Sequence, residues 1–250
     1  MPDPSTMRRA VLPVLLALGG LAGGVLGVRL LIRADPSKAG ENPYEYRLDS
    51  FRNPGPEPPR WAETAPIDTG MREPRGIAAD ARGGLAVAGD ANVVSFDHGG
   101  KRTGSFDLGG AAFCVAVDPG GDLVLGMKDH VEVWGTDGAR KESWASLGEE
   151  ARLTSIAAGR EQVVAADAGN RLVWRFDRSG VLAGTVGEEP RPGGTTGFVV
   201  PSPFFDAAFG PDGSLWVADP GRQRVERYSP EGTWKSSWGR ASMEIDGFCG

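Results

Sequence analysis

A pattern of short apolar segments separated by tight turns occurs four times between Pro74 and Gly239. Each copy has an apolar segment, a turn of Asp, Gly and Pro, a second apolar segment, a Val-containing segment that ends in an aromatic residue, and a tail. The aromatic residues fall at spacings of 38, 42 and 52 residues, at Phe96, Trp134, Phe176 and Tyr228. The last spacing is long because residues 188–200 form an insert rich in Gly, Pro and Thr. Without this insert the period stays near ~40 residues.

Repeats of this length that each hold four short strands are typical of a β-propeller, so we predict an all-β fold with four visible blades. The first strands, expected at residues 76–79, 114–117, 155–158 and 206–209, are small and apolar, as innermost strands near a shared axis require. The Gly-rich turns supply the positive φ values that tight hairpins need.

The third and fourth copies carry a further motif after the second strand. The third copy has Asp167, Asn170, Arg171 and Val173. The fourth copy has Asp219, Arg224 and Val225 in the same order, without a counterpart of Asn170. This motif resembles the NHL repeat over roughly residues 74–239. The resemblance implies six blades in a complete propeller, and Phe248-Cys249-Gly250 is similar to the start of a further, cysteine-bearing blade.

Two interpretations of this motif are open, and they concern the Asp/Arg pairs. The pairs could form a polar binding ring, or each carboxylate could accept hydrogen bonds from a guanidinium or from turn amides within its own blade. Because the pair recurs with the repeat, we favour the structural tie for Asp167, Asn170, Arg171, Asp219 and Arg224.

The N-terminus predicts a membrane anchor within residues 1–33. Arg8 and Arg9 precede an uncharged apolar stretch at residues 10–28, which is at the lower end of a bilayer-spanning length. A cleaved signal is the alternative, but its apolar core is usually shorter and the nearest small-x-small site, at residues 37–39, lies well beyond. The twin-arginine pattern is only partly matched. We therefore expect a single-pass anchor in the cytoplasmic membrane with the propeller outside the cytoplasm, or a periplasmic or secreted protein if the signal is cleaved.

Residues 34–73 are predicted to be a tether, with a proline-rich spacer at residues 53–59. An alternating segment at residues 44–48 could be a strand that closes the propeller. Because a four-bladed propeller would leave an open edge, we expect residues 74–250 to be truncated at the C-terminus or to close by self-pairing.

The charge of the chain argues against nucleic-acid binding. The whole chain has a formal charge of −6, and residues 1–39 hold five Lys or Arg and two Asp, which leaves −9 on the remainder. Phosphate binding requires clustered Lys and Arg, so an acidic propeller does not fit this class of partner.

The start of each first strand borders the central channel of a propeller, so residues from different blades converge there. We therefore predict a ligand-binding rim from Cys114, Ser155, Phe204 and Asp206, with Phe113 and Phe205 beside it. The alternative is that the phenylalanines pack between blades, as we also expect for most of the seven Trp. Cys114 is free and buried in our prediction, although a disulfide with Cys249 stays open.

Only two histidines are present, His98 and His130, and no Ser-His-Asp order or paired-carboxylate motif is evident. We therefore predict no catalytic residue, no metal site and no cofactor. The favoured function is a membrane-tethered binding or scaffolding module for a protein or a small ligand. The alternatives are a propeller enzyme, a lyase or hydrolase at the channel mouth, and the sensor half of a signalling protein.

Overall fold

The computed structural model describes residues 65–190, 196–200 and 205–239. The predicted N-terminal helix, the possible strand at residues 44–48 and the C-terminal residues 240–250 lie outside the described residues. Within the described ranges, no helix combines the length and apolar character that crossing a bilayer requires.

Sixteen strands form four antiparallel four-stranded sheets, each built from consecutive strands, as the sequence pattern predicted. The first sheet comprises β1 (Pro74–Ala79), β2 (Leu85–Gly89), β3 (Asn92–Phe96) and β4 (Arg102–Asp107). The second comprises β5 (Cys114–Val117), β6 (Leu123–Gly126), β7 (Val131–Trp134) and β8 (Arg140–Ser143). The third comprises β9 (Leu153–Ala158), β10 (Gln162–Asp167), β11 (Leu172–Asp177) and β12 (Leu182–Val186). The fourth comprises β13 (Ala207–Phe209), β14 (Leu215–Asp219), β15 (Arg224–Tyr228) and β16 (Trp234–Trp238), with a 3₁₀ turn at Pro220–Arg222.

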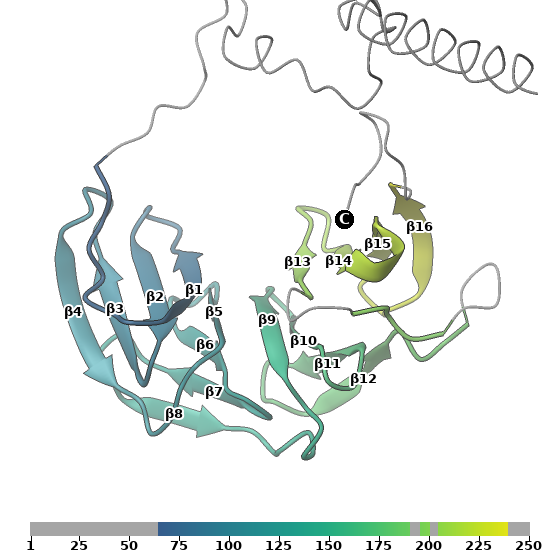
Figure 1. Ribbon diagram of the computed structural model, residues 1–250, viewed down its shortest axis with the longest axis horizontal. Coiled ribbons are helices and arrows are strands. Elements are labelled where there is room, and N and C mark those ends of the chain that lie inside the picture. The colour runs from purple at the N-terminus through teal and green to yellow at the C-terminus, as the bar shows by residue number, and fades with distance from the viewer. Residues whose placement is uncertain (1–64, 191–195, 201–204, 240–250) are drawn as a thin grey trace, which may run out of the picture. The chain divides into compact units, whose positions relative to one another are not determined.

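The four sheets follow one another along an arc, with the first strand of each on the inner side and the fourth on the outer side (Figure 1). The inner strands lie next to one another in chain order, β1 against β5, β5 against β9 and β9 against β13. This arrangement explains the small residues of the first strands, because these strands crowd together while the outer strands spread apart.

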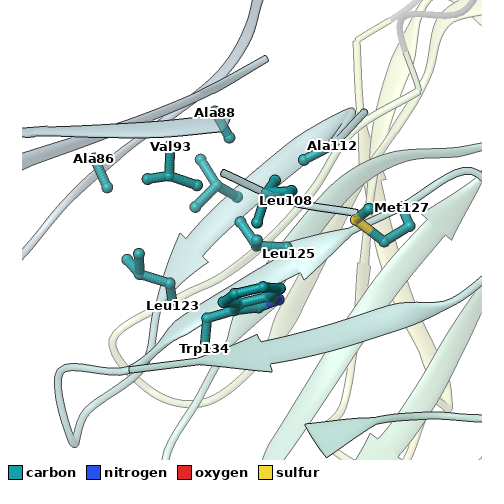
Figure 2. Packing of buried hydrophobic residues seen from close by; sticks show 10 residues of the cluster. Ala86, Ala88, Val93, Leu108, Ala112, Leu123, Leu125, Met127 and Trp134 are labelled. Carbon is teal, nitrogen blue, oxygen red and sulfur yellow. The ribbon is translucent and has the colours of Figure 1, made fainter. Parts of the chain in front are cut away.

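Each sheet has two apolar faces that differ in residue size. We call the face turned toward the next sheet in sequence the forward face, and the face turned toward the preceding sheet the rear face. The forward face of the first sheet carries Ala86, Ala88 and Val93, and the rear face of the second sheet carries Leu123, Leu125 and Trp134. These six residues share one buried cluster, in which small side chains face large ones (Figure 2).

The same arrangement repeats at the next two interfaces. The forward faces present Val124 and Val131 in the second sheet, and Val164, Ala166 and Val173 in the third. The opposing rear faces present the third-strand aromatic residues, Phe176 and Tyr228, which are both buried. At the three interfaces, the third-strand aromatic residue of the following sheet, which is Trp134, Phe176 or Tyr228, therefore fills the space between neighbouring sheets.

Charged side chains also link neighbouring sheets away from the inner strands. Arg178, in the turn between β11 and β12, forms an ion pair with Asp118 in the turn between β5 and β6. Arg175 of the third sheet donates from Nη1 to the carbonyl oxygen of Glu231 in the fourth sheet at 2.5 Å. These bonds link the second sheet to the third and the third sheet to the fourth.

Tight packing at the interfaces also explains Gly180, between β11 and β12. Its φ of +81° lies in the left-handed region, and an added Cβ would lie only 2.4 Å from Nε1 of Trp144. Trp144 packs against Phe176 with ring centroids 5.0 Å apart. Glycine is therefore required at this turn both by the backbone conformation and by the neighbouring sheet.

The insert at residues 188–200 contributes to the core between the third and fourth sheets. Phe198 is buried and packs against Phe205, with ring centroids 5.0 Å apart. Its backbone N–H donates to the carbonyl oxygen of Arg171 at 3.0 Å. The repeat pattern has no equivalent of Phe198, so the sequence predicts only an interruption of the repeat here and not a core residue.

Truncating one buried residue at an interface should reveal how strongly neighbouring sheets stabilise each other. We expect Leu125→Ala, at a side chain that is 0% exposed, to lower the free energy of unfolding by about 2–5 kcal/mol because it opens a cavity at the interface. Leu182→Ala, at a side chain that is 49% exposed, is the matched control and should change it by less than about 0.5 kcal/mol. Urea unfolding followed by tryptophan fluorescence measures both, and equal effects would contradict the interface described above.

Candidate functional site

The four positions that open the inner strands are structurally equivalent. Gly76 pairs with Ala88, Cys114 with Gly126, and Ser155 with Ala166, each on the second strand of its own sheet. Asp206 completes the series, because its carbonyl oxygen accepts the backbone N–H of Ala218 at 2.9 Å. Of the predicted rim residues, Cys114, Ser155 and Asp206 thus stand at one level of the fold.

The inner strands of all four sheets line one cavity of about 580 Å³. Ile77 is the most exposed of the large apolar side chains along its wall, with 66% of its surface accessible. Ala79 and Ala208 are also exposed there. The side chains along the cavity wall are therefore mostly apolar, and the polar ones lie near the start of the strands.

Ser155 and Asp206 form the polar centre of the site. The Ser155 hydroxyl donates to Oδ1 of Asp206, across the boundary between the third and fourth sheets. The same carboxylate oxygen accepts the backbone N–H of Ala207 at 2.8 Å. Asp206 is exposed whereas Ser155 is buried, so the serine orients a carboxylate that faces the cavity.

Thr154 provides a second bond between these two sheets. Its hydroxyl donates to the carbonyl oxygen of Phe205 at 2.6 Å. Phe205 itself is buried against Phe198, so it packs between the sheets and does not line the rim as an open aromatic surface. Phe204, which we predicted as a rim residue, lies outside the described residues.

Cys114 is a buried free thiol beside the polar centre. Burial raises the pKa of this thiol from 9.0 to about 12; a backbone hydrogen bond from Gly126 opposes the shift, and the negative charge of Asp206 adds to it. The thiol therefore stays protonated at neutral pH, which makes it a poor nucleophile. Its role in the site is packing, and Cys249 lies outside the described residues.

A guanidinium group stands at the other end of the row of inner strands. Arg75 lies over the ring of Phe113, 4.5 Å from the ring centroid, and its Nη2 pairs with Glu73 at 2.7 Å. Arg75 also lines the cavity. The repeat pattern does not identify Arg75 as a site residue, because Arg75 lies one position before the predicted strand and its aromatic partner belongs to the next sheet.

The carboxylates of the NHL-like motif lie away from the cavity and bind the segments that lead into their sheets. Asp167, which is fully buried, accepts the backbone N–H of Arg152, Gly169 and Asn170 and the side-chain N–H groups of Asn170 and Trp174. Among the described residues, the Arg171 side chain donates none of these bonds, and it is exposed.

Asp219 is equally buried in the fourth sheet, but its partners differ. Its carboxylate accepts from Arg222 Nη1 at 2.7 Å and from the backbone N–H of Val199 at 3.0 Å. Arg224 Nε lies farther away, at 3.7 Å, and Arg224 pairs instead with Glu226. Turn amides and the lead-in segment therefore surround Asp167, whereas Asp219 is bound by Arg222 and by one amide of its lead-in segment, so neither carboxylate depends mainly on the Arg of the motif.

Neither histidine belongs to the cavity. His130, just before β7, contacts Asp129 through Nδ1 at 2.9 Å, and His98 is exposed in a turn. Within the described parts of the chain, no group of three or more His, Cys, Asp or Glu could hold a metal ion.

The fold can be compared with solved structures. A streptogramin B lyase structure is similar, with a TM-score of 0.56 and 13% identity over 69% of this chain and 57% of that chain. A protein of unknown function from Bacteroides caccae is similar with a TM-score of 0.52 and 13% identity, over 69% of this chain and 62% of that one. The described chain has a β-propeller fold.

This chain thus spans less than two thirds of the length of both of those structures. A virginiamycin B lyase from Staphylococcus aureus matches with a TM-score of 0.47 and 13% identity, over 70% of this chain and 72% of that one. No protein-family model and no curated protein matches the sequence. The two structures with TM-scores above 0.5 support the propeller fold, and the four sheets are its blades.

The buried thiol should give the fold a measurable dependence on alkaline pH. In the unfolded chain Cys114 ionises near pH 9, whereas in the folded chain it keeps its proton up to about pH 12. The folded state therefore binds more protons between these values, so the contribution is complete below pH 9 and is lost as pH rises toward 12. We expect the free energy of unfolding to fall more steeply above pH 9 with Cys114 than in Cys114→Ala.

Urea unfolding at several pH values between about 8 and 11, with Cys249→Ser as the common background, measures this difference. Parallel pH profiles for the two proteins would contradict a raised pKa of Cys114.

Proposed function

We propose that this chain is a membrane-tethered, extracytoplasmic β-propeller of the NHL type that binds a protein or small ligand at the cavity of its inner strands. The observation that carries this proposal is the convergence of equivalent positions from all four sheets on one cavity with the Ser155–Asp206 pair beside it. A repeat architecture places such positions together without requiring the same residue in each blade.

The surroundings of the cavity suit recognition of a ligand with an apolar body. Exposed Ile77 and the small residues of the inner strands offer van der Waals contact, and Asp206 offers a carboxylate oriented by Ser155. Arg75 adds a cationic group that is already held by Phe113 and Glu73. A few polar side chains among mostly apolar ones are the usual composition of a small-molecule or peptide site.

The NHL assignment is supported by the repeated carboxylates. Asp167 and Asp219 hold the same place at the end of the second strand, and each accepts the backbone N–H of a segment that precedes the first strand of its blade, at Arg152 and Val199. The tether is supported by the apolar stretch at residues 10–28. Basic residues lie on both sides of this stretch, so charge does not set the orientation, and placement outside the cytoplasm is proposed because it is the simplest arrangement for a propeller behind an N-terminal signal.

The binding proposal is tested with the full chain in detergent by thermal-shift screening against a panel of amines, carboxylates and short peptides. We expect compounds that raise the melting temperature to lose about tenfold or more in affinity in Asp206→Asn or in Ile77→Asp, because an oriented charged contact or an apolar contact is lost. Glu161→Gln, an exposed carboxylate in the turn between β9 and β10, is the matched control and should bind normally.

Binding that persists in both cavity variants, or a panel without a single stabilising compound, would contradict the proposal. Mass spectrometry of the released compound separates binding from the alternative of a lyase or hydrolase, since an enzyme would return an altered product.

The placement proposal is tested in intact spheroplasts of a bacterial host that expresses the full chain. We expect added protease to digest the propeller, and an alkaline carbonate wash to leave the undigested chain in the membrane pellet, because a spanning helix resists extraction. Release of a shortened chain into the soluble fraction would show signal cleavage, and full protection from protease would contradict placement outside the cytoplasm.

A further inference from the structure

The forward face of the fourth sheet is exposed, although the equivalent faces of the other three sheets are buried. Ala88 and its equivalent in the third sheet, Ala166, are 0% exposed. In the fourth sheet the same register holds Trp216, Ala218 and Val225, of which Trp216 is 37% exposed and the other two are partly exposed. Because the forward face of the fourth sheet has the same apolar pattern as three buried faces, we expect another segment to cover it.

Arg227 on this face occupies the register of Arg175, an arginine that bonds across to the next sheet, while Nη2 of Arg227 pairs with Asp212 in its own sheet. Arg175 pairs with Val164 on the forward face of the third sheet, and Arg175 reaches the carbonyl oxygen of Glu231 in the fourth sheet. Arg227 holds the equivalent register beside Trp216 and lies over its ring at 5.5 Å. Among the described residues, Nε of Arg227 is buried without a hydrogen-bond partner.

The other interfaces show which element covers the inner part of a forward face. The inner strand β5 contacts β1 and β2, β9 contacts β5 and β6, and β13 contacts β9 and β10. By the same rule, the next inner strand would contact β13 and β14, where Ala208, Trp216 and Ala218 lie.

The chain contains a segment of suitable length and pattern for this position. Six residues connect β4 to β5 and nine connect β8 to β9, while ten residues separate Trp238 from Cys249. The dipeptide Phe248-Cys249 repeats Phe113-Cys114, which opens the inner strand of the second sheet. If Cys249 is equivalent to Cys114, Gly250 is equivalent to Val115.

The sizes of the facing residues agree with this register. The second-strand residue equivalent to Trp216 shares a buried cluster with a residue of the next inner strand at each interface: Ala86 with Val115, Val124 with Ile156, and Val164 with Ala207. The two residues of each pair therefore share a limited volume. Trp216 is the largest residue at the forward position, and the segment would place Gly250, the smallest residue, opposite it. A larger side chain at position 250 would overfill the interface.

We propose that residues 247–250 dock on the forward face of the fourth sheet as a further inner strand of the propeller, with Cys249 beside Asp206 and Gly250 against Trp216. Two existing contacts define the expected neighbours. Ser155 hydrogen-bonds to Asp206 across one interface, and a Cβ on Gly76 would lie 2.9 Å from Cα of Cys114 across another. Equivalent positions of adjacent inner strands are therefore close enough for a disulfide.

The test uses the full chain with Cys114→Ala and Asp206→Cys, treated with copper phenanthroline as a mild oxidant. We expect an intramolecular disulfide between positions 206 and 249, detected by peptide mass spectrometry under non-reducing conditions. The matched control is Ser237→Cys with Cys114→Ala, because Ser237 is exposed on β16 and lies much closer to Cys249 along the chain. Docking predicts cross-linking about tenfold faster at position 206 than at position 237, whereas an undocked tail would favour the shorter loop.

A second measurement keeps Asp206 and uses the reactivity of the native Cys249 thiol in the Cys114→Ala chain. We expect Trp216→Glu to raise the rate of alkylation by iodoacetamide about tenfold, because a charge on the face releases the docked strand. Ile77→Glu, at an exposed apolar residue of the first sheet, should leave the rate unchanged. Faster cross-linking at position 237, or equal alkylation rates in all three chains, would overturn the proposal.

Discussion

The division of volume between neighbouring sheets is the constraint on which the rest of this structure depends. At each of the three interfaces between consecutive sheets, the apolar face of one sheet is buried against the apolar face of the next. Small residues on each forward face leave space for the aromatic wedge on the following rear face, as Val93 does for Trp134 and Val173 does for Tyr228. Since packing in protein interiors is close to that of organic crystals, exchanging the sizes of these residues would leave cavities or overfill the interface.

This packing brings the inner strands together and thereby creates the candidate site. Ser155 and Asp206 are 51 residues apart in the chain, yet they meet because their strands belong to adjacent sheets of equal register. The same geometry places Cys114 beside them in a buried position, where its thiol keeps its proton. Asp206 is therefore the polar group that we propose contacts a ligand in the cavity, whereas Cys114 packs in the core.

Buried carboxylates perform a different task at the end of the second strands. Asp167 accepts five hydrogen bonds from its own turn, from Trp174 and from the segment before β9, so its charge is compensated without a cation. The charge of Asp219 is compensated instead by the guanidinium of Arg222 and by one backbone amide. A buried charge requires dense hydrogen bonding, and the two sheets satisfy this requirement with different donors. The recurrence of these residues therefore follows from the architecture of the blade.

The sequence by itself determined the strands and turns, because alternation and turn chemistry act over a few residues. It also determined that Gly76, Cys114, Ser155 and Asp206 occupy equivalent positions, since they share one place in the repeat. Only the tertiary structure decided that Arg75 stacks on Phe113, that Phe198 enters the core, and that Arg222 lies closer to Asp219 than Arg224 does. The first two contacts join different sheets or an insert to a blade, so they depend on how segments distant in the chain are placed, which local pattern does not encode. The third is local, but it depends on how the turn at Pro220–Arg222 directs two nearby side chains, which the spacing of the motif does not specify.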